Sequence, residues 1–159
     1  MSAIPARPWH ALFAPLPPEA VVRRQPVASP EILATPEGAA IAGWEQLIVE
    51  LSAGAAGLRV VMVVLDATGR PISASDLVLY RSEPGAGRAG GSPSMTEVRQ
   101  HSVGGRLEAD GTFRGTRWLT VGVEGVDEDE PRLESTKSEP STADAAGLTA
   151  LVADLMRRL

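Results

Sequence analysis

The side chains best suited to chemistry in this sequence lie on a polar run near residue 100. Glu97, Arg99 and His101 alternate along it, so in a strand they share one face. Histidine can transfer protons near neutral pH, and arginine binds anions. If Asp76 and Arg117 come from neighbouring strands, the same face combines an acid, a histidine and two arginines.

This face gives two hypotheses. In the first, it is the concave wall of a pocket for a small anionic ligand or a reaction. The residues expected to line that pocket are Asp76, Arg99, His101, Arg117 and Trp118. In the second, the face meets solvent and its charges only keep it hydrated, as is common for one side of an antiparallel sheet.

Other motifs with chemical meaning are weak. Gly85, Gly87 and Gly90 match the G-x-G-x-x-G spacing, but a strand-like run follows where a dinucleotide site needs a helix, so no cofactor is expected. The sequence has no cysteine, and His10 and His101 have no spacing that suggests a shared metal. We therefore expect no metal site, and no residue is assigned a catalytic role.

Composition excludes further classes of function. The formal charge of −5 argues against a nucleic-acid partner. The longest apolar run, Val60 to Leu65, is too short to cross a bilayer, so no membrane partner is expected. The absence of cysteine is compatible with a reducing compartment, and a cytoplasmic location is expected.

The elements that position these residues begin with an N-terminal arm. Residues 1–36 contain eight of the thirteen prolines, which predicts an extended chain without a central strand. Its apolar side chains, among them Leu12, Phe13 and Leu16, predict that the arm packs on the domain or on a second subunit. Thr35 and Pro36 then resemble a helix start, and the spacing of Ile41, Trp44, Leu47, Ile48 and Leu51 predicts a helix of about fifteen residues.

Two hairpins follow the predicted helix. Leu58–Leu65 and Ile72–Arg81 are joined at a turn over Asp66–Gly69, in a register that places Arg59 opposite Asp76. A second pair, 95–107 and 113–123, is joined at Asp110–Gly111, a strong hairpin signal. Pairing outward from that turn places Val103 opposite Trp118, with a bulge expected at Gly104 and Gly105.

The rest of the chain is predicted to be a solvated acidic linker and a helix. Residues 127–140 carry one large apolar side chain, too few for a packed segment. Ser141 and Asp144 then resemble a capping box, and an apolar stripe continues to Leu159. The predicted units are an arm over 1–36, a core over 37–126, a linker over 127–140 and a helix over 141–159. The predicted fold is α+β, an antiparallel sheet of about four strands with an N-terminal and a C-terminal helix on one face.

Two functions are compatible with this architecture. The first is a small cytoplasmic, non-catalytic module for protein interaction, with a homodimer formed through the arm, the C-terminal helix or both as its simplest form. The alternative is a ligand-binding protein or enzyme with the pocket around His101.

Overall fold

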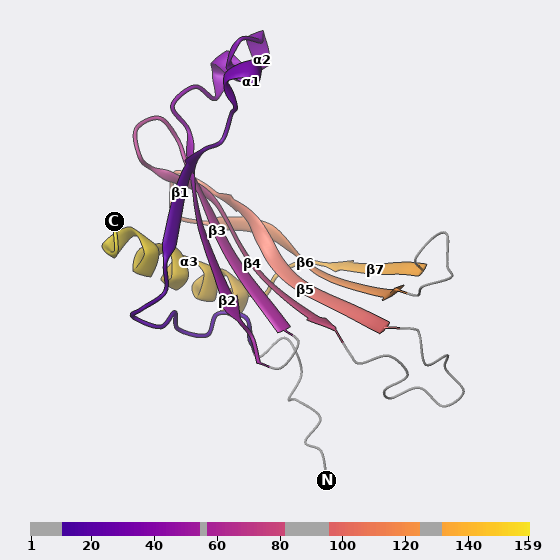
Figure 1. The fold of residues 1–159 in the computed structure, drawn as a ribbon. Coiled ribbons are helices and arrows are strands. Elements are labelled where there is room, and N and C mark those ends of the chain that lie inside the picture. Colours follow the sequence, from indigo (N-terminus) through magenta and orange to yellow (C-terminus); the bar gives the residue numbers. More distant parts are fainter. Residues whose placement is uncertain (1–10, 55–56, 82–95, 125–131) are drawn as a thin grey trace, which may run out of the picture.

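The computed structural model describes residues 11–54, 57–81, 96–124 and 132–159. Seven strands form one antiparallel sheet in which each strand pairs with its neighbours in sequence, and a long helix lies across one face (Figure 1). The elements in chain order are β1 (Val22–Pro26), α1 (Pro30–Leu33), α2 (Pro36–Ala40), β2 (Glu45–Ser52), β3 (Gly57–Leu65), β4 (Pro71–Arg81), β5 (Thr96–Leu107), β6 (Phe113–Glu124), β7 (Arg132–Ser138) and α3 (Thr142–Arg157).

The prediction of a four-strand sheet is wrong, because three further strands extend the two expected hairpins. β1 lies at one edge and β7 at the other (Figure 1). β7 lies within the predicted acidic linker. Its pairing with β6 needs only backbone hydrogen bonds, so the segment is ordered although Ser135–Glu139 remain exposed.

The predicted N-terminal helix over residues 37–51 is also wrong beyond its first turn. Thr35 caps α2 by accepting a hydrogen bond from the Gly38 amide, as expected, but this helix ends at Ala40. The rest of the segment is β2, in which Leu47 and Val49 are fully buried on one side. Apolar residues at 47, 48 and 51 fit a helix, but those at 47, 49 and 51 fit a strand equally well, and pairing with β1 and β3 selects the strand.

Both hairpins close through three-residue loops that change the predicted registers. Asp66 and Arg70 pair across the first loop, and a bulge between Val64 and Leu65 adds another residue on β4. Val61 is therefore opposite Asp76, two positions from the expected pairing. A shift of two leaves every side chain on its predicted face.

The second register differs by one residue, which has a larger effect. The Glu108 amide donates to the Thr112 carbonyl, and Gly111 has a φ of 87°, so the loop is one residue longer than an Asp-Gly turn. Arg117 is opposite Val103, and Trp118 is opposite Ser102. The pairing continues through Gly104 and Gly105 without the expected bulge.

The core lies between α3 and the face of the sheet that it covers, which we call the inner face. α3 begins with the predicted capping box, in which Ser141 and Asp144 exchange backbone and side-chain hydrogen bonds. Its apolar stripe packs on alternate residues of β2 to β6, and the arm adds two leucines. The core members are Leu12, Leu16, Leu47, Val49, Val61, Val63, Leu65, Ala74, Val78, Val103, Phe113, Leu148, Leu151, Val152 and Leu155.

Candidate functional site

Four of the five predicted ligand-binding residues lie on the inner face. Asp76 of β4 and Arg117 of β6 both pair with Val103, which lies between them on β5. His101 precedes Val103 by two residues and therefore points to the same side. The predicted convergence of an acid, a histidine and an arginine across the sheet is present, but Asp76 and His101 are buried and do not form part of a hydrated face.

Asp76 forms a fully buried ion pair with Arg59 on β3. Arg59 Nε and Nη2 donate to the two carboxylate oxygens at 3.0 and 2.7 Å, and the side chains are 5% and 0% exposed. Both partners also bind the arm: Asp76 accepts from the Phe13 amide at 2.6 Å, and Arg59 donates to the Ala14 carbonyl at 2.6 Å. These bonds compensate for removing the two charges from water, and they hold the arm on the sheet.

Arg117 connects the sheet to α3 through Asp144. Arg117 Nε donates to Asp144 Oδ2 at 3.0 Å, and a second short contact joins Nη2 to Oδ1. Burial alone would raise the pKa of Asp144, but the hydrogen bonds from Arg117 and Ser141, with the Arg117 charge, hold this pKa below its usual value. One carboxylate thus caps the helix and fixes it to β6.

His101 is buried between Val78 and Leu119, its partners on the adjacent strands, with 3% of the residue exposed. Burial, together with the positive charges of Arg99 and Arg117, lowers the pKa of His101 from 6.5 to about 4. The imidazole is therefore neutral at physiological pH, and its burial prevents direct contact with a dissolved substrate.

The other two predicted residues are not bound into this cluster. The Arg99 side chain is half exposed and is bound by Glu97 Oε1 at 2.6 Å. Trp118 points to the opposite face of the sheet, where the Lys137 ammonium lies 5.6 Å from its ring. The one-residue change in register is the reason that Trp118 does not join His101.

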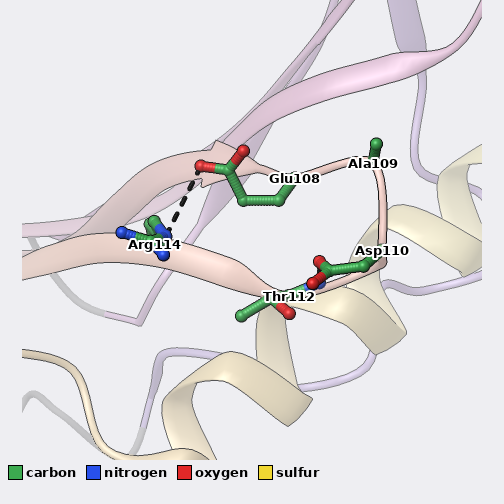
Figure 2. A pocket seen from close by; sticks show the side chains of 5 residues that line it. All are labelled: Glu108, Ala109, Asp110, Thr112 and Arg114. Carbon is green, nitrogen blue, oxygen red and sulfur yellow. Dashed lines mark hydrogen bonds and ion pairs between the residues drawn. The ribbon is translucent and has the colours of Figure 1, made fainter.

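None of the five predicted residues lines either of two prominent open hollows on the described surface. One, of about 340 Å³, lies at the tip of the β5–β6 hairpin, where Arg114 Nε is 3.7 Å from Glu108 Oε1 (Figure 2). Asp110 in this hollow is engaged in the turn, where it accepts a hydrogen bond from the Thr112 amide. The second, of about 460 Å³, lies between the arm and β2–β3.

The described residues contain no group of three or more side chains arranged to hold a metal ion. Nor does this part of the chain contain a helix that is long and apolar enough to span a membrane.

The apolar residues on both sides of segment 58–65 suggested that this strand needs a partner surface, but no site was assigned to the other side of the sheet, which we call the outer face. Of the described helices, α3 is the one that packs substantially on the sheet, and it lies on the inner face. Apolar side chains on β3 and β4 are only half buried on the outer face, and Leu58 and Trp118 are 41% and 39% exposed. The signal was present in residues 58–65, which are apolar at successive positions and therefore on both sides of β3.

Comparison with known proteins gives no match to a protein family, to a curated protein or to a solved structure.

Proposed function

We propose that this protein is a non-catalytic interaction module that forms a homodimer through the outer face of its sheet. The observation that supports this proposal is the composition of that face. Its central positions on β3 to β6 are uncharged and combine apolar side chains with Ser, Thr, Gln and Gly. They are Leu58, Val60, Met62, Val64, Ser73, Ser75, Leu77, Leu79, Val98, Gln100, Ser102, Gly104, Thr116, Trp118, Thr120 and Gly122.

Charged residues are confined to the margins of this face. Arg23 on β1 is neutralised by Glu50 on β2, at 2.6 Å. Arg106 and Arg114 occupy opposite positions in the register at the far end of β5 and β6. An uncharged centre with a charged rim is the usual composition of a protein interface. Sheets stack about 10 Å apart when their facing side chains interdigitate, so a second copy of the same surface is a suitable cover.

The area of the face is compatible with a dimer. Four strands about 4.8 Å apart, each contributing about eight residues at about 3.3 Å, present roughly 500 Å² on each copy. Two such surfaces bury a total of about 1,000 Å², close to the smallest area expected of a specific protein interface.

The proposal moves the interface away from the arm and the C-terminal helix. Leu12 and Leu16 of the arm and Leu148, Leu151 and Leu155 of α3 are buried within one chain, so their apolar surface is already covered. The outer face has no such cover among the described elements.

Sedimentation velocity of the full chain tests the dimer. Leu79→Lys places a charge within the uncharged part of the outer face and is expected to weaken dimerisation at least about tenfold. Ile32→Lys is the matched control, because Ile32 is 47% exposed on α1, beyond the end of the sheet (Figure 1). A wild-type chain that stays monomeric throughout the micromolar range contradicts the proposal, as does equal weakening by both substitutions.

A pocket around His101 has less support as an alternative function, because Asp76 and Arg117 are bound to Arg59, the arm and α3. A cytoplasmic location is part of the proposal and is compatible with the absence of cysteine.

A further inference from the structure

The arm is held to the inner face by bonds to its backbone. The Asp76 carboxylate accepts from the Phe13 amide, and the Arg59 guanidinium donates to the Ala14 carbonyl. At the end of α3, Arg158 donates to the carbonyls of Leu16 and Pro17, each at 2.8 Å. Sites that bind extended peptides use main-chain bonds in this way for affinity and side-chain pockets for specificity.

Side-chain pockets accompany the backbone contacts. Leu12 and Leu16 are 4% and 5% exposed and belong to the core. The Phe13 ring lies against α3 at Gly147, where the Cβ of any other residue would be 2.5 Å from the ring carbon Cγ. A side chain at position 147 would therefore block the ring, so the glycine provides the recess that the ring occupies.

The fit of the arm is incomplete in two respects. Phe13 has a φ of 64°, a left-handed conformation that is unfavourable for a residue with a bulky side chain. The hollow of about 460 Å³ also separates the arm from β2–β3, where Ala11, Ala14 and Pro15 face Leu51 and Ala53. This hollow is open to solvent, so these apolar side chains meet water where larger side chains on the arm would cover them.

We infer that Arg59, Asp76, Arg158 and Gly147 form a peptide-binding site, which the chain's own arm occupies in the absence of a ligand. The ligand is an extended, uncharged segment of a partner protein that keeps the two leucine anchors and carries larger apolar side chains where the arm has Ala11 and Ala14. Such a segment fills the hollow and displaces the arm. A charged ligand side chain beside the Arg59–Asp76 ion pair is disfavoured, because the two residues already neutralise each other and burying a third charge is costly.

The arm competes with any ligand because it is tethered to its site. A short tether gives an effective concentration in the millimolar range. A free peptide therefore binds the wild-type chain weakly, and weakening the arm exposes the intrinsic affinity of the site.

Binding of synthetic peptides to the full chain tests the inference. One labelled peptide has the sequence of residues 11–20, and a second carries leucine in place of Ala14. The receptor is the full chain with Leu12→Glu and Leu16→Glu, in which charges at the two anchors release the arm. Fluorescence anisotropy should give affinity for both peptides, about tenfold or more higher for the second, because its larger side chain fills the hollow.

Two neighbouring arginines provide the matched control. Arg157 and Arg158 both form ion pairs with Asp154, but of the two it is Arg158 that donates to the described part of the arm. Arg158→Ala in the arm-released chain should weaken peptide binding severalfold, and Arg157→Ala should leave it unchanged. Equal effects of the two substitutions would overturn the inference.

Hydrogen exchange of the wild-type chain gives a second measurement that does not depend on the arm-released variant. Addition of the leucine-containing peptide should accelerate exchange of the arm amides, above all that of Phe13, because the displaced arm loses the bond from the Phe13 amide to Asp76 and the burial of Leu12 and Leu16. Unchanged exchange at saturating peptide, or no binding to a folded arm-released chain, rejects the site. Equal affinity for the two peptides rejects a foreign segment with larger side chains and leaves the arm sequence itself as the ligand of the site.

The test is independent of dimerisation through the outer face. A Leu79→Lys chain that is monomeric in sedimentation should still bind the peptide once its arm is released, because the two surfaces lie on opposite sides of the sheet. Loss of one property therefore leaves the other intact.

Discussion

Two ion pairs of the sheet that use the same chemistry differ in burial and therefore in their effect on stability. Arg59 and Asp76 are almost fully buried, whereas Arg23 and Glu50 are each about half exposed. Asp76→Ala leaves the Arg59 charge buried without its carboxylate and should lower the free energy of unfolding by about 3–5 kcal/mol. Urea denaturation followed by circular dichroism measures the loss.

Glu50→Ala is the control for that substitution. Exposed pairs contribute about 0.2–1 kcal/mol because water and salt screen them. Equal losses in the two variants would mean that the bonds from Asp76 and Arg59 to the arm do not persist in solution.

The lowered pKa of His101 predicts that the stability of the folded chain falls as the pH is lowered. The pKa of His101 in the folded chain is about 4, below the ordinary 6.5, so the unfolded chain takes up the proton first as pH falls. Stability is therefore lost between pH 6.5 and about 4, by up to about 3 kcal/mol. Unfolding free energies measured across this range should decrease toward acid, and His101→Leu should flatten the curve.

The matched variant for this experiment is His10→Gln, since His10 is the other histidine of the chain. This variant should keep the slope of the wild-type curve. If the slope survives in His101→Leu and disappears in His10→Gln, the pH dependence comes from His10, and the prediction for His101 is wrong.

At the candidate site, the sequence predicts which residues of one strand share a face, but not the exact register between two strands. The alternation that grouped Glu97, Arg99 and His101 was sufficient to predict a shared face. The position of Trp118 depended on whether the hairpin loop has two or three residues, and Ala109-Asp110-Gly111 allows both. Because a one-residue slip reverses the face, a small difference in loop geometry removed Trp118 from the predicted group.

At the scale of elements, the contact between Gly147 on α3 and Phe13 on the arm predicts that Gly147→Ala has opposite effects on stability in the wild-type chain and in a Phe13→Ala chain. Alanine is a better helix former than glycine by roughly 0.5–1 kcal/mol. In the wild-type chain, however, its Cβ would collide with the Phe13 ring, so Gly147→Ala should destabilise by about 1–3 kcal/mol. In a Phe13→Ala background the same substitution should stabilise the protein.

Thermal or urea unfolding of the wild type, Gly147→Ala, Phe13→Ala and the double variant gives the coupling energy between the two positions. A Gly147→Ala effect that has the same sign in both backgrounds would contradict the contact between the arm and α3. The result also bears on the peptide-binding site, since this contact forms one of its pockets.

Elements with a strong local signal were predictable, and those that depend on pairing were not. The Ser141 cap and the stripe that follows it lie within one continuous segment, and both are confirmed in α3. β2 and β7 have no comparable signal. Residues 45–52 fit two periodicities, and 132–138 are mostly polar, so both become strands only because β1, β3 and β6 supply hydrogen-bonding partners.

At the scale of the whole molecule, sheet, arm and α3 share one core and should unfold together. α3 contributes Leu148, Leu151 and Leu155 to the same cluster as Val63 and Val103, and Arg117 joins it to β6. A helix attached by a solvated linker would melt before the sheet, whereas a shared core makes the transition cooperative. Ellipticity at the helical band and Trp118 fluorescence, in a chain with Trp9 and Trp44 replaced by Phe, should therefore give the same urea midpoint. Trp118 reports from the outer face, opposite α3, so an earlier helical transition would show that α3 is not part of the cooperative unit.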